Sequence, residues 1–433
     1  METTPAGPDL EDIRHGEQDV ERLRLSRAWI GGVAFLAVAI AILPFGLAPS
    51  RTGEVANTTV RSGAAPNQPV IDLGAPIWER PGEVSLGPIV ETPDGFLVTG
   101  IENTHEDPWP AFTLTSTDGR SWTEVWRQVG ATEELSAVSD GTAILAISTS
   151  TNSDPSLSRW SGESWQELPL PLPAGTAEAS VQVLGVTANG WLAAGLSSPS
   201  SYDERTDVTV WRSRNGGDWT SEVVSSDVGT IFYLHHVLVH DGVETIVASA
   251  RLDERAEIDG ADSSTSPPHP LLIRNVAGSW QIDDLSPLTA HLTEPAMVNL
   301  RAIDSRVVDG LLLTWWQADN GNGDQPLRAM FLTRVSRSGE PSADEVVGPL
   351  LDSIVVDDSQ FYALGNRDPL TDTPATQLMR SIDGVTWAPV GALNGASLLR
   401  LYPTRGDELL ATGHLHDAVN AAAIWLLSAP SSD

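Results

Sequence analysis

Ser-Thr-Asp-Gly-Arg-Ser-Trp at residues 116–122 decides the fold, because variants of this phrase return along the chain. It recurs as Ser-Arg-Asn-Gly-Gly-Asp-Trp at 213–219 and as Ser-Ile-Asp-Gly-Val-Thr-Trp at 381–387. Shorter forms stand at 161–165, 277–280 and 336–339. A period of about 40–60 residues indicates a repeat architecture, in which each unit packs against its neighbours.

An Asp-Gly or Asn-Gly pair runs in phase with this phrase, each time between two short apolar runs. The pairs begin at Asp94, Asp140, Asn189, Asp241 and Asp309. Such a pair predicts a type I′ hairpin turn, because that turn requires φ > 0 at both central residues. Two further units follow with altered turns, at 357–358 and 405–407, so the sequence predicts seven hairpins.

Each predicted hairpin is followed by a loop, a third apolar strand, the repeated phrase and a fourth strand. Four antiparallel strands repeated seven times predict an all-β fold, a seven-bladed β-propeller. The seventh unit ends after its third strand at 424–427, whereas Ile77-Trp78-Glu79-Arg80 resembles a fourth strand and precedes the first hairpin. We therefore expect residues 77–80 to complete the last blade, because closure removes two open sheet edges.

The repeated phrase resembles the Asp box, or bacterial neuraminidase repeat, of sialidase-like propellers, over residues 75–430. The resemblance implies that the box is the turn between the third and fourth strands. Its Asp would accept backbone N–H bonds of the turn, and its Trp would pack into the blade. The box residues are then structural: Ser116, Asp118, Trp122, Ser213, Asn215, Trp219, Ser381, Asp383 and Trp387.

The same resemblance implies what a catalytic member needs: three Arg around a carboxylate, a Tyr/Glu nucleophile pair and an Asp acid. The family's Arg-Ile-Pro phrase is missing, and Glu79-Arg80-Pro81 is the nearest string. Arg301 and Arg400 fall on predicted first strands, without a third Arg on another. We therefore predict a non-catalytic member with no catalytic residues. A glycoside hydrolase working in the central depression is the alternative, because the separation of two carboxylates is not readable from sequence.

The composition is acidic, with 58 Asp and Glu against 25 basic residues, all of them Arg, and a formal net charge of −33. Such a chain repels phosphates, so nucleic acid is excluded as a partner. The chain has no Cys, which excludes disulfides, thiolate metal sites and a Cys nucleophile.

Residues 28–48 form an uncharged apolar run long enough to span a bilayer. Arg22, Arg24 and Arg27 precede the run, which places the N-terminus inside and the propeller outside the cytoplasmic membrane. A cleaved signal peptide is the competing interpretation, but the long preceding segment and Pro49 favour an uncleaved signal anchor. The predicted domains are a cytoplasmic tail (1–27), the transmembrane anchor (28–48), a flexible linker (49–74) and the propeller (75–430).

The loops between second and third strands are long, acidic and on one face of the predicted ring, whereas the other face has tight turns and little room for a site. Function on a rigid scaffold concentrates in such loops. With the two axial arginines, the candidate binding residues are Glu102, Glu106, Asp107, Asp203, Glu204, Asp207, Asp253, Glu254, Arg301 and Arg400. The net charge alone explains the same acids as an ordinary solvated surface. We expect a non-enzymatic binding or scaffold module for an envelope protein or glycan, and a structural subunit of an envelope complex is a third class.

No cofactor is predicted. Asp319, Asn322 and Asp324 lie in an oxygen-rich loop, which leaves Ca²⁺ as an alternative, but the loop lacks the EF-hand spacing. His414 and His416 fall on one side of an extended segment, as Zn²⁺ ligands do, but without an identified third ligand. The His235-His236 pair on an inner strand is interpreted as a hydrogen-bonded core pair.

The anchor predicts a specific protease result. Protease added to intact cells should remove the propeller and leave a small membrane-protected stub that carries the N-terminus, because Arg22, Arg24 and Arg27 hold that end inside. The stub is detected with an antibody against residues 1–27. A released propeller that lacks residues 1–48 would show instead that the segment is a cleaved signal peptide.

Overall fold

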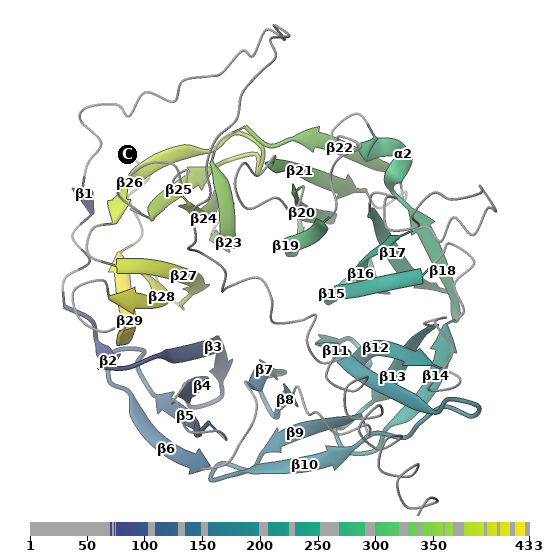
Figure 1. Ribbon diagram of the computed structural model, residues 1–433, viewed down its shortest axis with the longest axis horizontal. Helices are drawn as coiled ribbons and strands as arrows, with labels where there is room; N and C mark the ends of the chain where they lie inside the picture. The colour runs from purple at the N-terminus through teal and green to yellow at the C-terminus, as the bar shows by residue number, and fades with distance from the viewer. Residues whose placement is uncertain are drawn as a thin grey trace, which may run out of the picture. The chain divides into compact units, whose positions relative to one another are not determined.

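Seven sheets of four antiparallel strands, one with an added fifth strand, stand around a central axis in the computed structural model (Figure 1). The structure describes residues 70–71, 73, 75–102, 109–128, 135–148, 155–198, 207–224, 230–251, 268–290, 299–319, 328–336, 340–347, 349–357, 360–366, 376–393, 396–404, 408–415 and 421–428. No helix in these ranges is long and apolar enough to cross a membrane. The predicted anchor at 28–48 lies outside them.

Each sheet is one blade, and its strands follow chain order from the axis outward. Blades 1 to 4 are β3 (Val84–Thr92), β4 (Gly95–Glu102), β5 (Ala111–Ser116), β6 (Thr123–Gln128); β7 (Leu135–Ser139), β8 (Ile144–Ser148), β9 (Ser156–Trp160), β10 (Trp165–Pro169); β11 (Glu178–Thr187), β12 (Gly190–Ser198), β13 (Asp207–Ser213), β14 (Thr220–Val224); and β15 (Thr230–His240), β16 (Val243–Arg251), β17 (His269–Val276), β18 (Ser279–Asp284). A short helix, α2 (Ser286–Thr289), leads to blade 5.

The last three blades contain both N-terminal strands. They are β19 (Asn299–Val308), β20 (Leu311–Asp319), β21 (Arg328–Val335), β22 (Pro341–Glu345); β23 (Leu350–Asp357), β24 (Gln360–Asn366), β25 (Gln377–Ser381), β26 (Ala388–Leu393) with β1 (Val70–Ile71); and β27 (Ala396–Pro403), β28 (Glu408–Leu415), β29 (Ala421–Ser428) with β2 (Trp78–Arg80). The seven-bladed propeller that the repeats predict is therefore confirmed.

The ring is closed by the N-terminal strand, as predicted. β2 pairs antiparallel with β29, with Trp78 opposite Ile424 and Arg80 opposite Ala422. Upstream of it, β1 pairs in parallel with the end of β26, so Val70 and Ile71 add a fifth strand to blade 6. These two residues fall inside the range that the sequence assigns to the linker.

The hydrophobic core is divided into seven clusters, and each fills the interface between two neighbouring blades. At the closing interface, Val84 and Leu114 of blade 1 pack with Leu410 and Ile424 of blade 7. Indole N–H groups also join blades, as where Trp165 Nε1 of blade 2 donates to Thr113 Oγ1 of blade 1 at 2.8 Å. Each blade therefore depends on both of its neighbours for burial of its apolar faces.

The three full copies of the repeated phrase form turns with one hydrogen-bond pattern. Asp118 Oδ1 accepts from the backbone N–H groups of Arg120 and Ser121 at 2.8 and 2.9 Å. Asn215 accepts the equivalent pair at 2.9 and 3.0 Å, and Asp383 does so at 2.9 and 2.8 Å. The N–H groups of Ser121 and Arg120 lower the pKa of Asp118 below its ordinary value. These side chains brace their turns, which is the structural role predicted for them.

The two repeated phrases run in phase because they touch. In blade 1, a Cβ on Gly95 would lie 2.1 Å from the carbonyl oxygen of Ser116, where the braced turn begins. In blade 3, a Cβ on Gly190 would lie 2.4 Å from the carbonyl oxygen of Ser213. Glycine is therefore required at both places by the close approach of the third strand's end to the first hairpin.

The type I′ expectation holds at two of the five predicted turns. Asp241 and Asp309 have φ of 51° and 52°, and the glycine after each is also positive. At Asp94 and Asn189 the expectation is wrong, because the two-residue loop ends before the glycine: Thr92 pairs with Gly95, and Thr187 with Gly190. At Asp140 it is also wrong, because the carboxylate accepts the N–H groups of Thr142 and Ala143 and forms a longer turn.

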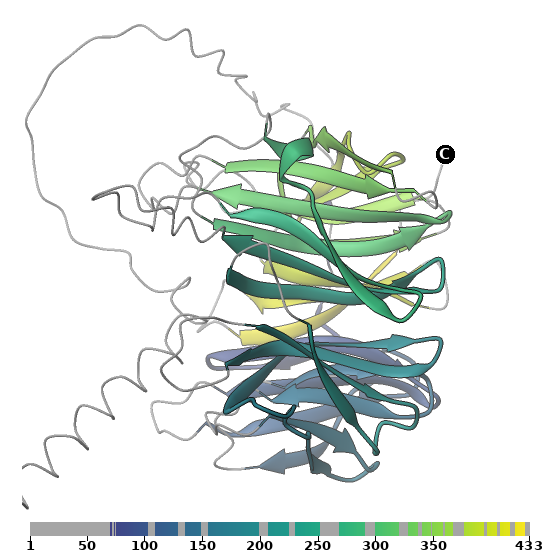
Figure 2. The same cartoon turned by 90° about the vertical axis from the view of Figure 1, so that its right-hand side faces the viewer.

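The tight turns gather at one face of the ring, called the turn face here, as the edge-on view shows (Figure 2). The connections between second and third strands leave from the opposite face, called the loop face. They are residues 103–110, 149–155, 199–206, 252–268, 320–327, 367–376 and 416–420.

The repeated Trp residues differ in burial, which corrects the expectation that all three are largely buried. Trp387 is 5% exposed, whereas Trp122 and Trp219 are half-buried. In blade 6 the segment that follows β22 pairs with the turn: Val347 bonds through its backbone to Val385 and Trp387, and Val346 lies in the same buried cluster as Trp387.

This difference predicts unequal effects of alanine substitution. Trp387→Ala should lower the free energy of unfolding by about 3–5 kcal/mol, the range for emptying a buried aromatic site. Trp122→Ala and Trp219→Ala should cost less, because water already reaches part of each ring. Denaturant unfolding of the three variants measures the free energies of unfolding. Equal losses of free energy in the three variants would contradict the effect assigned to the burial of Trp387.

Candidate functional site

The first strand of each blade lies nearest the axis of the ring (Figure 1). Six of these seven strands contain a β-bulge, which leaves backbone groups without a partner in their own ladder. Side chains of the neighbouring blade supply some of the partners: Leu234 N donates to Gln182 Oε1 at 2.9 Å, and Leu401 N donates to Ser353 Oγ at 3.1 Å. These hydrogen bonds join the first strands of neighbouring blades around the axis.

Arg301 lies on β19, near the loop-face end of that strand. Its Nε and Nη2 donate to Gln317 Oε1 at 3.3 and 2.8 Å, and Gln317 is itself buried. Nη2 also lies 4.0 Å from Asp352 Oδ1 of the next blade. The Arg301 side chain keeps 58% exposure, so its guanidinium is oriented by these partners and is still accessible to a ligand.

Arg400, the other predicted axial arginine, lies near the middle of β27, where it is exposed and pairs in register with Thr412. Blade 6 separates it from Arg301. Asp352 of β23 stands in that intervening blade, and sequence reasoning missed it. The sequence signal that could have found Asp352 is the one that identified the two arginines: a charged residue within a predicted first strand.

Glu102 is the predicted binding residue with the most complete environment, and its carboxylate is bonded within the protein. Arg80 Nε approaches it at 2.7 Å, and both Nη groups of Arg127 donate to it at 3.0 Å. Glu124 bridges the same two arginines, both of which lie over the Phe112 ring. Because Arg80 belongs to β2, this cluster joins the closing strand to blade 1.

The hydrogen bond from Arg127, with the charges of Arg80 and Arg127, holds the pKa of Glu102 below its ordinary value despite some burial. The four side chains of this cluster are therefore ionised together at neutral pH.

The other predicted acidic residues are described only in part. Asp207 is the first residue of β13, at the loop face. Glu106, Asp107, Asp203, Glu204, Asp253 and Glu254 lie outside the described residues, so their binding role stays a prediction.

The residues predicted to bind a metal ion are also described only in part. Asp319 Oδ1 accepts a hydrogen bond from Asn299 Nδ2 at 2.8 Å, and His414 lies on β28. Asn322, Asp324 and His416 fall outside the described ranges. Within those ranges, three metal-ligating side chains nowhere gather closely enough to hold an ion.

The hydrogen-bonded pair predicted at His235 and His236 is found in part, because His236 Nε2 is buried without a hydrogen-bond partner among the described residues. His235 Nε2 lies 3.0 Å from Ser249 Oγ, and its ring meets Trp316 edge-on at 5.8 Å. Burial, helped by the neighbouring His236 and Arg301, lowers the pKa of His235 to about 3. Burial also lowers the pKa of His236. Both rings are neutral at physiological pH.

The turn face is not short of room, and this part of the prediction is wrong. A cavity of about 790 Å³ opens there between blades 3 and 4, and another of about 370 Å³ is lined by residues of blades 1 and 7. The larger one falls in the size range of small-molecule sites. It arises because the short first hairpins and the braced turns of adjacent blades diverge as the blades twist.

Comparison with solved structures finds other β-propellers of low similarity. Trypanosoma rangeli sialidase in complex with sialic acid has 10% identity and a TM-score of 0.35, over 64% of this chain and 57% of the sialidase. The chain thus spans little more than half of that enzyme. Penicillium chrysogenum α-L-arabinanase with arabinobiose has 12% identity and a TM-score of 0.41, over 82% of this chain and 97% of the arabinanase. A variant of Synechocystis apocarotenoid oxygenase has 10% identity and a TM-score of 0.45, over 80% and 86%.

No protein-family model matches the chain, and no curated protein matches it in sequence. The named activities of the three structures differ, so the likeness concerns the fold.

The Glu102 cluster predicts a pH-dependent contribution to stability. A carboxyl whose pKa is depressed in the folded state stabilises it above the unfolded pKa, and this contribution is lost as the pH falls through the folded pKa. Glu102→Gln should therefore lower stability at pH 7 by about 1–2 kcal/mol, an amount typical of charged hydrogen bonds with partial exposure. The difference from the wild type should shrink once the pH falls below 4.5, the ordinary pKa of a glutamate carboxyl.

Thermal unfolding of both proteins from pH 7 to pH 3 checks this. Glu167→Gln is the matched control, because it removes one exposed charge from β10 without breaking a bond described in the structure. A pH-independent difference for Glu102→Gln would contradict the ionised cluster.

Proposed function

We propose that this protein is a non-enzymatic binding module, held in the cytoplasmic membrane by its N-terminal helix, with the propeller outside. Its loop face binds an envelope protein or a glycan. The proposal rests on one observation above all: every connection between second and third strands leaves from one face of a closed ring, whereas the opposite face has short turns. Loops carried on a rigid scaffold are where binding residues concentrate.

The chemistry at the loop-face mouth supports a polar partner. Arg301 presents an oriented, exposed guanidinium beside Gln317 and Asp352. The loops around it are acidic in sequence, with Glu106, Asp107, Asp203, Glu204, Asp253 and Glu254. A ring of carboxylates attracts a basic partner, and such attraction weakens as salt rises.

Five of the described carboxylates have lowered pKa values, which is typical of structural groups and not of a glycosidase acid. A glycosidase acid needs a raised pKa, so that it carries a proton at neutral pH. Glu102, Glu124 and Glu222 have lowered pKa values, and each accepts hydrogen bonds from arginine. Asp118 and Asp383 are lowered too, and they accept turn N–H groups. These groups serve the fold.

The test neutralises the loop acids and leaves Glu102 unchanged, because Glu102 holds blades together. Glu106, Asp107, Asp203, Glu204, Asp253 and Glu254 are changed to Gln or Asn in the full-length protein. The protein is immobilised and probed with solubilised envelope proteins and with envelope glycans at low and high salt. The bound partner should be lost in the variant and, in the wild type, should weaken as salt rises.

The matched control removes the same number of exposed acids that lie outside the second-to-third loops: Asp94, Glu163, Glu167, Asp309, Glu340 and Glu345. It should bind normally, and both variants should unfold near the wild-type temperature. Normal binding by the loop variant would refute the assignment of the loop face. Release of reducing sugar from a bound glycan would favour the hydrolase instead.

A further inference from the structure

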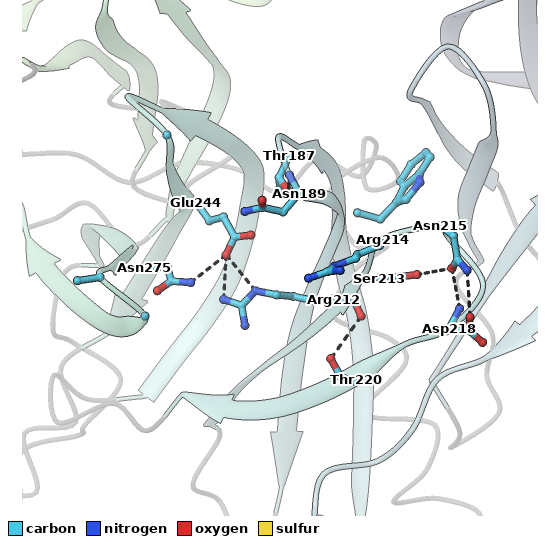
Figure 3. A pocket seen from close by; sticks show the side chains of 14 residues that line it. Thr187, Asn189, Arg212, Ser213, Arg214, Asn215, Asp218, Thr220, Glu244 and Asn275 are labelled. Carbon is cyan, nitrogen blue, oxygen red and sulfur yellow. Dashed lines mark hydrogen bonds and ion pairs between the residues drawn. The ribbon is translucent and has the colours of Figure 1, made fainter.

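The cavity between blades 3 and 4 on the turn face contains a buried carboxylate with one unused oxygen (Figure 3). Glu244 of β16 is 7% exposed. Its Oε2 accepts three hydrogen bonds, from Arg212 Nε at 3.0 Å, Arg212 Nη2 at 2.8 Å and Asn275 Nδ2 at 3.0 Å. Its Oε1 accepts none from any residue that the structure describes. This oxygen is therefore free to accept a hydrogen bond from a ligand that donates.

A second acceptor lies beside it. Asn275 Oδ1 of β17 is buried and has no hydrogen-bond partner among the described residues. Because Asn275 donates its amide to Glu244 Oε2, its own oxygen is left as an acceptor. The blade 4 side of the cavity therefore presents two neighbouring acceptors.

The blade 3 side presents donors. Arg214 and Asn189 are exposed, line the cavity, and form no side-chain hydrogen bond with the described part of the chain. Figure 3 shows both between the strands of blade 3 and the Glu244–Arg212 pair. A ligand that enters here meets donors on one wall and acceptors on the other.

The wall between them is rigid. Arg212 bonds Glu244 and Glu222 and stacks on the Trp280 ring with its guanidinium carbon 5.0 Å from the ring centre. Trp280 Nε1 in turn donates to Glu222 at 2.8 Å. These contacts fix the positions of Arg212 and Glu244 before a ligand arrives, which lowers the entropy cost of binding at that carboxylate.

The charges and the apolar area narrow the class of ligand. Two arginines, Arg212 and Arg214, and two carboxylates, Glu244 and Asp218, line the cavity, so it carries no excess charge. The carboxylates disfavour anions, and the arginines disfavour metal ions and other cations. Trp191, the large apolar lining residue, is 2% exposed, so its ring offers little surface on which a ligand could stack.

We infer that this cavity is a second binding site, distinct from the loop face, and that it takes a neutral oligosaccharide. Sugar hydroxyls donate to Glu244 Oε1 and Asn275 Oδ1, while other hydroxyls accept from Arg214 and Asn189. A hydroxyl can both donate and accept a hydrogen bond, and a neutral saccharide brings no net charge into the cavity. The volume of about 790 Å³ has room for two or three sugar rings.

The experiment measures binding of maltotriose, cellotriose, mannotriose and tri-N-acetylchitotriose to the full-length protein by calorimetry. Citrate and putrescine serve as an anionic and a cationic probe. At least one neutral trisaccharide should bind, and neither charged probe should. Arg214→Ala and Asn189→Ala should each weaken binding about tenfold or more, the effect of one lost charged or polar hydrogen bond in a site that excludes water.

Arg120→Ala is the matched control, because Arg120 is an exposed arginine of the equivalent turn in blade 1 and binds Glu408. It should bind the trisaccharide like the wild type. Arg214→Ala and Asn189→Ala should keep the wild-type unfolding temperature, since neither side chain is bonded in the described structure.

Three outcomes would overturn the inference: no binding of any of the four trisaccharides at millimolar concentration, binding unchanged in Arg214→Ala and Asn189→Ala, or binding of citrate or putrescine instead. The loop-face variant of the preceding test should still bind the trisaccharide, which separates the two sites.

Discussion

Closure of the ring is the constraint on which the other features depend. The apolar faces of each blade are covered by its two neighbours, so the buried residues that the structure describes form seven clusters, one at each interface between blades. Six of them form between consecutive blades, and the seventh needs the two ends of the repeat array to meet. β2 makes that possible, because it completes blade 7 with residues that precede blade 1. The ion pairs of the Arg80–Glu102–Arg127–Glu124 cluster then hold β2 against blade 1.

The same geometry explains why the two faces differ. Each blade twists from the axis outward, and the short turns on one face diverge enough to leave polar cavities between blades. In blades 1 and 3 the hairpin glycine lies against the end of the third strand, which fixes the spacing of both turns. Side chains on adjacent turns are thereby brought to repeatable positions, and small differences between blades decide whether a cavity forms. Glu244, Arg212 and Arg214 are such differences, because blade 1 has no equivalent cluster at its own turn.

The fold was predictable from sequence because its signals are local and repeated. Turn residues, apolar runs and the orphan strand at 77–80 each follow from short-range geometry, and the repeats reinforce one another. The turn types were less predictable: an Asp-Gly pair forms a type I′ turn only when strand pairing stops just before it, and the register of the whole blade sets that point.

The candidate sites were harder to predict because they depend on which blades face each other. Arg301 and Arg400 were found as charges on inner strands, but Asp352 was missed between them. Glu102 reads as a loop acid in the sequence, yet Arg80, which approaches it, is 22 positions away on a strand of another blade. Glu244 and Arg212 likewise belong to adjacent blades, and nothing local marks their contact.

The N-terminal strands also decide how the ring responds to tension. Any pull on the chain before residue 70 reaches the parallel pairing of Val70 and Ile71 with blade 6 first, and that contact is two residues long. Only after it parts does the load pass to β2, whose three residues hold blade 7 shut. The β1–β26 contact is therefore expected to break before the β2–β29 contact that closes the ring. Force strong enough to remove β2 would open the ring as well.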